Sequence, residues 1–436
     1  MLQLDHLPSR HRSPRVVSIA AVSIAAGLLA GCGSSQNGAA TGNSATAGQA
    51  SSPPTVHFLS MDYDSTSSAL QKQIVQDFNT QNPDGKVEID IVNWNDGHQK
   101  LQTLIAGNQA PDLALVGTRW MAEYAKADLL ADLGEAVKQG VPSAEFVPSV
   151  LNAGRINGRL AGLPAAASVR GLYFNKTMLK KAGVAPPRNW AELTAAAAKI
   201  QAAHAGIAGF GVQGKEVETD LYFYYFLWGA GGQILGPDGK SALTSPAAVE
   251  ALDYELSLVK KKLTEPQPTG YNREDLQNLF KAGKLAMVIT GPWFAGMLKK
   301  EAPALDFGVA FIPGKSGPVV PAVTDEIVMF KSTANKELAQ KFLAFWYRDA
   351  NRLAWAKASG MVPEKTTVAK NPDLTKDKQR AFFIAALPRG RYVPTHPQWE
   401  QMANAVSDSV QQALLGQADA KTALQAASAK VDALAK

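Results

Sequence analysis

Short β-rich runs alternate with helical patterns from about residue 55 to the end of the chain. In the first half, the β-rich runs are residues 56–60, 87–92 and 113–116, with helical patterns over 67–79 and 98–106. In the second half, strands are predicted over residues 171–174 and 284–290, and helices over 176–182 and from 190 onward. Such alternation is typical of α/β folds with parallel strands, because each helix carries the chain back between neighbouring strands. We therefore predict an α/β architecture.

Two helix boundaries can be placed from single residues. Asn189 precedes an alanine-rich helical pattern, and an asparagine side chain at that position can accept a hydrogen bond from the first helical turn. From Trp399 onward the pattern is helical, and Gly416 is expected to separate two helices.

The ends of the first and third β-rich runs are the first candidate ligand contacts. In open α/β sheets, ligands lie beyond the carboxyl ends of the strands. The segments that follow these runs, 61–66 and 117–120, are therefore expected to be ligand-contacting loops. Their side chains most suited to a polar ligand are Asp62, Tyr63, Arg119 and Trp120.

The N-terminal segment has the pattern of a leader rather than of a folded element. Three arginines within residues 10–15 precede an apolar stretch over 16–29, which is too short for a comfortable membrane span. The stretch ends in Leu29-Ala30-Gly31-Cys32, which resembles the lipobox of bacterial lipoproteins, and Cys32 is the only cysteine. We predict a signal peptide over 1–31 and a lipid, with palmitate among its acyl chains, on Cys32; the alternative is an ordinary signal without lipid.

Residues 32–54 are expected to be a disordered tether. After Cys32 the segment is rich in Gly, Ser, Ala and Asn and contains no aliphatic residue larger than alanine. It cannot bury enough apolar surface to offset the entropy of ordering. The body is thus expected on the outer face of the cell membrane, in contact with the membrane through the lipid anchor only.

The composition argues against nucleic-acid binding. The formal net charge is +6 among 82 charged residues, and the lysine runs at 180–181, 260–262 and 299–300 are scattered and lack interleaved aromatic residues. Solvated helix faces account for them.

Motifs for cofactors, metals and catalysis are incomplete. Residues 209–214 fit GxGxxG, but Glu216 stands where a phosphate-binding loop needs Ser or Thr. The acidic residues from Asp62 begin like a calcium loop but lack its glycine and final glutamate. The histidines outside the leader lack the HExxH spacing of zinc enzymes, and GxSxG is absent. We predict no cofactor, no metal site and no catalytic residues.

Three blocks of residues, in the same order, resemble the extracellular solute-binding proteins of ABC transporters (family 1, maltose-binding type). The resemblance covers residues 55–436. The blocks are Pro111-Asp112 with Trp120 and Leu129-Leu130; Leu172 to Lys176 with Ala182-Gly183, Pro186-Pro187 and Trp190; and Phe280, Gly283-Lys284, Ala286-Met287 and Gly291-Pro292-Trp293.

This resemblance implies a two-lobed periplasmic-binding-protein fold (class II) in which hinge strands join the lobes and the solute binds between them. By matching blocks, the crossings are expected near residues 164–170, 321–326 and 360–363. The lobe boundaries then become 55–166 and 323–362 for the N-lobe, and 167–322 and 363–436 for the C-lobe with the C-terminal helices.

The resemblance also nominates ligand-binding residues. Trp293 matches the stacking tryptophan, which would contact the apolar face of a sugar. Ser168, Arg170 and Asp325 lie at predicted hinge crossings, and Trp399 lies near the C-terminal aromatic contact. From the aromatic run 222–228, Tyr222 is the residue expected to face the cleft, because only one side of a helix can do so.

We therefore predict a monomeric, lipid-anchored binding protein, not an enzyme, that delivers a mono- or oligosaccharide to the permease of an ABC importer. One alternative is another small polar solute, such as glycerol phosphate, a polyamine or a peptide: Arg170 favours an anion, whereas Asp325 and Glu326 favour a cation. A second alternative is an extracytoplasmic carbohydrate-active enzyme, although no motif nominates the two carboxylates it needs.

Overall fold

The computed structural model describes residues 53–134, 140–216, 218–315 and 317–435. The predicted signal peptide, the lipidation site at Cys32 and nearly all of the predicted tether lie outside these residues. The strands are β1 (Thr55–Met61), β2 (Lys86–Val92), β3 (Leu113–Gly117), β4 (Arg155–Ile156), β5 (Arg159–Leu160), β6 (Leu163–Val169), β7 (Gly171–Asn175), β8 (Met287–Thr290), β9 (Phe307–Ala310), β10 (Ile312–Pro313), β11 (Pro318–Val319) and β12 (Ala322–Met329).

Helices follow most of these strands and carry the C-terminal part of the chain. They are α1 (Ser65–Gln81), α2 (Trp94–Ala106), α3 (Thr118–Lys126), α5 (Pro148–Ala153), α6 (Lys176–Lys181), α7 (Trp190–Ala203), α8 (Thr219–Gly229), α9 (Pro246–Lys260), α10 (Arg273–Lys281), α11 (Trp293–Glu301), α12 (Lys336–Trp346), α13 (Asp349–Ser359), α14 (Thr366–Ala369), α15 (Pro372–Thr375), α16 (Lys378–Ala386), α17 (Trp399–Leu414) and α18 (Ala420–Leu434).

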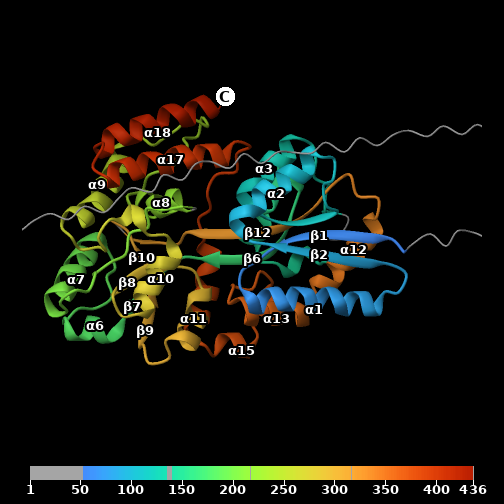
Figure 1. The fold of residues 1–436 in the computed structure, drawn as a ribbon, viewed down its shortest axis with the longest axis horizontal. Helices are drawn as coiled ribbons and strands as arrows, with labels where there is room; N and C mark the ends of the chain where they lie inside the picture. Colours follow the sequence, from blue (N-terminus) through green and yellow to red (C-terminus); the bar gives the residue numbers. More distant parts are fainter. Residues whose placement is uncertain (1–52, 135–139, 217, 316, 436) are drawn as a thin grey trace, which may run out of the picture. The chain divides into compact units, whose positions relative to one another are not determined.

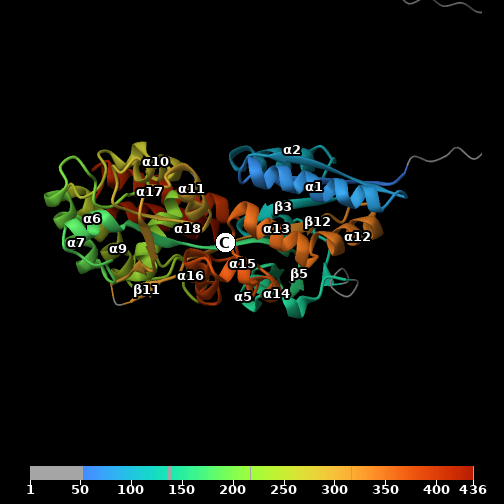
Figure 2. The same ribbon diagram turned by 90° about the horizontal axis from the view of Figure 1, so that it is seen from below.

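A five-stranded sheet with the order β2-β1-β3-β12-β6 organises the first part of the fold. Strand β1 is parallel to β2 and β3, as the alternation of strands and helices predicts, whereas β12 is antiparallel to both β3 and β6. Apolar side chains of α1, α3 and α12 bury one core with this sheet. Helix α13 lies alongside α1 (Figures 1 and 2).

A three-stranded sheet with the order β8-β7-β9 organises the second part, and here the prediction of parallel strands is wrong. Strand β7 is antiparallel to both neighbours. Strand direction depends on the path of the chain between strands, and residue periodicity does not encode that path. Strand β8 is also shorter than predicted: Leu285 pairs only in an isolated bridge with Ala208.

Two paired strands lead from the first sheet towards the second (Figure 1). Strand β6 pairs with β12 along its length, from Leu163 opposite Ile327 to Val169 opposite Ala322. After Arg170 the chain continues directly as β7 of the second sheet. An isolated β-bridge between Ala167 and Val362 places the third predicted crossing, residues 360–363, beside strand β6. The lobe boundaries that were assigned within these segments stay predictions.

The C-terminal helices pack against the helices of the second part. Helices α17 and α18 contact each other, and they cover α8 and α9 (Figure 1). The predicted break is confirmed, because Gly416, with φ of 74°, lies between α17 and α18. The cap at α7 is also confirmed, since the Asn189 side chain accepts a hydrogen bond from the Glu192 amide. In the described part of the chain, no helix is long and apolar enough to cross a membrane.

Candidate functional site

Tyr63 lies at the centre of an aromatic cluster beside the paired strands. Its hydroxyl donates a hydrogen bond of 2.6 Å to the Asp325 carboxylate on β12. Its ring makes edge contacts with Trp94 at 5.5 Å and with Trp355 at 5.3 Å between centroids. Burial raises the pKa of Asp325 to about 7, even though the hydrogen bond from Tyr63 lowers it. The cluster thus joins the loop after β1, the first turn after β2 and helix α13 to the crossing strand β12.

Trp120 extends this cluster from helix α3. Its ring stacks on His98 at 4.9 Å and contacts Trp94 at 5.5 Å. The prediction that Arg119 and Trp120 belong to a loop is wrong, because the extended backbone of Gly117 ends β3 and helix α3 begins at Thr118. Both side chains therefore project from a first helical turn rather than from a flexible segment.

Arg119 connects α3 with α8 and α17. Its Nε donates a hydrogen bond to Glu400, and its Nη2 lies 3.7 Å from the Asp220 carboxylate. Burial raises the pKa of Asp220 to about 6, although the charge of Arg119 opposes this shift. Asp220 Oδ2, the Tyr224 hydroxyl and the Trp399 indole nitrogen are buried without hydrogen-bond partners in the described residues. Polar atoms of this kind are suited to a polar ligand or to water.

Arg170 and Arg273 share one carboxylate next to Trp293. Arg170 Nη2 donates to Glu218 at 2.5 Å, and Arg273 Nη1 donates to the other oxygen of Glu218 at 2.8 Å. Arg170 also donates to Ser168 Oγ at 2.8 Å. The two guanidinium groups lie 5.0 and 5.2 Å from the centroid of the Trp293 ring, within cation–π range. Although burial raises the pKa of Glu218, the two arginines hold it at about 2.

Two glycines determine where the Trp293 indole lies. A Cβ atom at Gly291 would lie 1.9 Å from the indole, so the ring can fold back over residue 291 only if that residue is glycine. Gly360, at φ of 72°, approaches Trp293 Cα so closely that a Cβ would lie 2.8 Å away. The Gly291 carbonyl accepts a hydrogen bond from the Tyr173 hydroxyl. The indole remains half-buried and touches the small cluster around Trp355 and Met361.

Comparison with known proteins places this site in a family. The family model of bacterial extracellular solute-binding proteins matches residues 63–352, which is well over half of the chain. A protein of Brucella abortus that is named as a binding protein is 37% identical over 416 residues, which are 94% of this chain and 98% of that one. The chain belongs to the family of bacterial extracellular solute-binding proteins. Its members are binding components of ABC transporters rather than enzymes.

Two further relatives have names that state a ligand. A maltooligosaccharide ABC transporter solute-binding lipoprotein of Streptococcus pneumoniae is 26% identical over 320 residues, which are 70% of this chain and 73% of that one. The maltose-bound protein MalE3 of Thermotoga maritima has a TM-score of 0.79 at 26% identity, and the match covers 87% of this chain and 99% of that one. The predicted α/β periplasmic-binding-protein fold of the maltose-binding type is confirmed.

The structure of this solute-binding protein brings most of the predicted ligand residues into two connected groups. Tyr63, Asp325 and Trp120 belong to the aromatic cluster, while Ser168, Arg170 and Trp293 share the charged group; Arg119 and Trp399 lie at the junction of α3, α8 and α17. Asp62 is exposed in the loop before α1, and it accepts a hydrogen bond from Ser68 of that helix. Their roles in ligand binding stay predictions.

Tyr222 belongs to neither of these groups, and its expected position facing the cleft stays a prediction. It is fully buried next to Phe210, and its hydroxyl donates to the Gly211 carbonyl. Tyr225, one helical turn on, instead shares a hydrogen bond with Arg170. Every residue of α8 is buried, and residues 221–229 are all apolar or aromatic, so the sequence there contains no polar face that could identify the correct side of this helix.

Several residues of the site were missed from the sequence. Trp94 follows β2 as Tyr63 follows β1, so the rule that ligands lie beyond strand ends would have found it. Glu218 and Arg273 are ordinary charged residues in sequence, and only the tertiary structure brings them to Trp293. Trp355 and Glu400 likewise come from late helices with no local signal.

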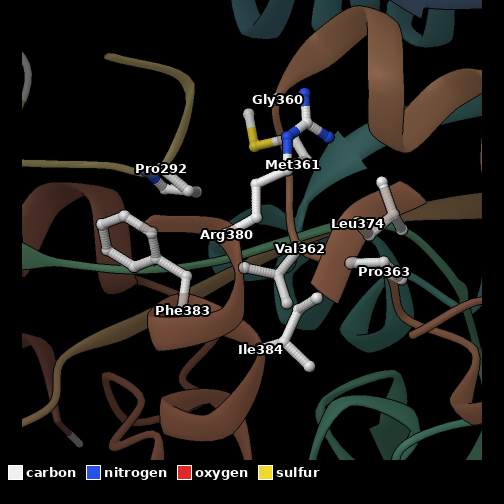
Figure 3. Close-up of a pocket in the computed structure, with 9 residues that line it drawn as sticks. All are labelled: Pro292, Gly360, Met361, Val362, Pro363, Leu374, Arg380, Phe383 and Ile384. Carbon is white, nitrogen blue, oxygen red and sulfur yellow. The ribbon is translucent and has the colours of Figure 1, made fainter. Parts of the chain in front are cut away.

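A small apolar pocket lies next to this site (Figure 3). Its lining residues are Pro292, Gly360, Met361, Val362, Pro363, Leu374, Arg380, Phe383 and Ile384. The only charged lining side chain, Arg380, donates to the carbonyls of Ala356 and Lys357. The pocket thus offers little to a polar solute. Within the described residues, no group of three or more His, Cys, Asp or Glu side chains could hold a metal ion.

Proposed function

We propose that this protein captures a mono- or oligosaccharide for an ABC importer at the site formed by Tyr63, Trp94, Trp120, Trp293 and Trp355. One observation carries the proposal: aromatic rings from five separate elements converge beside polar groups, with the Asp325 carboxylate on Tyr63 and two guanidinium groups at Trp293. A pyranose has apolar C–H faces and a rim of hydroxyl groups. It is therefore bound best by flat aromatic surfaces combined with groups that donate and accept hydrogen bonds.

The polar groups of the site support a ligand rich in hydroxyl groups. Asp220 Oδ2 can accept a hydrogen bond, the Trp399 indole nitrogen can donate one, and the Tyr224 hydroxyl can do both. Sugar hydroxyls can pair with all three kinds of atom. The names of the relatives support the same class of solute, since one binds maltooligosaccharides and another was solved with maltose.

The proposed binding motion is closure about the paired strands β6 and β12. A solute that touches groups on both sides of these strands stabilises the closed form, because a ligand shifts a conformational equilibrium through its differential affinity for the two states. Arg119 already links α3 with α8 and α17, so this residue is expected to separate from Asp220 and Glu400 when the protein opens. The closed monomer would then dock on the permease.

The membrane attachment is a separate part of the proposal, based on the lipobox-like sequence that ends at Cys32. When the bacterial host is grown with radioactive palmitate, we expect the protein to carry the label and to be found in the membrane fraction. Cys32→Ser should abolish the label and release the protein from the membrane fraction. A Cys32→Ser protein that keeps the label would rule out lipidation at this residue.

The carbohydrate assignment is tested by thermal shift of the purified protein. The probes are neutral sugars from glucose to maltotriose, the uronates of the monosaccharides, sugar phosphates, polyamines, amino acids and short peptides. A ligand at about a hundred times its dissociation constant should stabilise the protein by about 2.7 kcal/mol. We expect the response to be confined to carbohydrates. A response only to phosphates, polyamines or peptides would overturn the carbohydrate assignment while leaving the family unchanged.

The variant Trp293→Ala locates the binding site in the same experiment. We expect it to weaken binding of the responding sugar by about 1–3 kcal/mol in isothermal titration calorimetry, as removal of a buried aromatic anchor does. The matched control is Tyr254→Ala, which removes a half-buried aromatic ring that stacks on Trp190 at 4.2 Å, beside the hydrophobic core shared by α7, α8 and α9. This control should lower stability and leave affinity unchanged. A folded Trp293→Ala protein with wild-type affinity would remove Trp293 from the site.

A further inference from the structure

Glu218 has an unfavourable backbone conformation at the start of helix α8. Its φ and ψ are 72° and 9°, in the left-handed region that non-glycine residues seldom adopt. Residues held in such conformations cluster at functional sites, where the surrounding structure over-determines them. Here the conformation directs the Glu218 carboxylate between Arg170 and Arg273, each of which binds one of its oxygens. The contacts of the side chain are thus those of an internal counter-ion.

The charges around Trp293 are balanced through Glu218. Arg170 is only 3% exposed, and its ion-pair partner is Glu218. Arg273 contacts Glu218 on its inner side and Glu274 at 2.7 Å on its outer side. At the other end of the site, Asp220 and Glu400 pair with Arg119. In the described part of the site, each of the three arginines therefore has a carboxylate partner from the chain itself.

The balance of charges around Trp293 favours an uncharged solute over an anionic one. An uncharged hydroxyl group can bind beside the guanidinium groups without displacing any partner. A carboxylate on the solute meets Glu218 at the same guanidinium groups, and two carboxylates at one site repel each other. It could bind only by displacing Glu218, which would leave that carboxylate without its partners in a mostly buried position.

We propose that Glu218 determines the charge class of the solute: it occupies Arg170 and Arg273, so that the site accepts neutral sugars and rejects uronates. This inference rests on the proposed carbohydrate-binding function. It assigns Glu218 to specificity rather than to stacking or hydrogen bonding of the sugar. It also explains how a site with three arginines selects a ligand without charge.

Glu218→Gln is the central variant, because glutamine keeps the size of the side chain and one acceptor oxygen but removes its charge. The affinities of wild type and variant are compared by calorimetry for matched pairs, glucose with glucuronate and galactose with galacturonate. Wild type should bind the neutral sugar of a pair at least tenfold more tightly than its uronate. In Glu218→Gln this preference should fall at least tenfold. Inorganic phosphate is the second probe: it should bind to the variant in the millimolar range and not to wild type.

Two further variants separate specificity from a general loss of structure. Glu274→Gln removes the other carboxylate that contacts Arg273, on the exposed side, and should leave the sugar preference unchanged. The double variant Glu218→Gln/Arg273→Gln leaves Arg170 as a single arginine without its carboxylate partner, so its preference for the neutral sugar should lie between those of Glu218→Gln and wild type. If Glu218→Gln does not fold, Arg273→Gln is used instead and should exclude uronates at least as strongly as wild type.

The outcomes distinguish this inference from the proposed function. An unchanged preference in Glu218→Gln with no phosphate binding would overturn the inference, and so would a wild-type protein that binds a uronate as tightly as the neutral sugar. If wild type binds no carbohydrate at all, the proposed function fails. The phosphate arm still decides in that case whether Glu218 neutralises the arginine pair, since that result does not depend on the sugar.

Discussion

Replacing Arg352 with alanine is expected to lower the free energy of unfolding by about 3–5 kcal/mol, the usual cost of breaking a buried ion pair from one side. The Arg352 side chain is fully buried, and its Nε donates to Glu364 at 2.5 Å. Its Nη2 donates to the Ala165 carbonyl on the crossing strand β6. Without the guanidinium group, Glu364 would be left as a buried and uncompensated carboxylate.

Aromatic packing adds to the expected loss. The Arg352 guanidinium lies 5.5–5.8 Å from the ring centroids of Trp346, Tyr347 and Trp355. Because Trp355 also contacts Tyr63, the cavity left by the substitution would adjoin the proposed sugar site. We therefore expect Arg352→Ala to weaken sugar binding as well as stability. Urea denaturation, monitored by far-ultraviolet circular dichroism, measures the change in the free energy of unfolding.

Two comparisons test this explanation of the Arg352 effect. Arg348→Ala removes an exposed arginine next to the same helix and should change stability by no more than about 0.5 kcal/mol. The double variant Arg352→Met/Glu364→Leu removes both charges and should recover most of the loss, because an apolar pair needs no compensation. An Arg352→Ala protein as stable as wild type would show that water or a rearranged partner compensates Glu364.

The elements of this fold were largely predictable, because local rules determine them. Asn189 caps α7, and Gly416 separates α17 from α18, since both depend on the chemistry of one residue. The direction of β7 relative to β8 was not predictable. It depends on the path of more than a hundred intervening residues, and periodicity within either strand contains no information about it.

The site was predictable where it follows from strand ends and motifs, and not where it depends on tertiary contacts. Tyr63 follows a strand, and Trp293 belongs to a recognisable Gly-Pro-Trp motif, so both were nominated. Tyr222 and Tyr225 lie on a helix with no exposed face, and the sequence could not distinguish the residue in the core from the one beside Arg170. Glu218 has a left-handed backbone conformation and contacts Arg170 and Arg273, which no local sequence pattern indicates.

Replacing Glu255 with leucine is expected to stabilise the protein at neutral pH by roughly 3 kcal/mol. Glu255 lies on α9 with no exposed surface, and neither oxygen of its carboxyl group has a hydrogen-bond partner in the described residues. Burial raises its pKa to about 8. Since an unfolded glutamate has a pKa of about 4.3, the folded chain binds the additional proton between these two values. The stability of wild type should therefore fall as pH rises through this window.

The difference between variant and wild type isolates Glu255 from other titrating groups. Glu265 is also buried with a pKa raised to about 8, although the Val212 amide donates to its carboxylate, so it contributes a similar slope in both proteins. The stabilisation by Glu255→Leu should accordingly grow from pH 5 to pH 8 and then level off. Glu250→Leu, on the same helix but in an exposed ion pair with Lys315, should show no such growth. A constant difference across this range would mean that Glu255 is ionised in the folded protein, and that water or a polar group compensates its charge within the core.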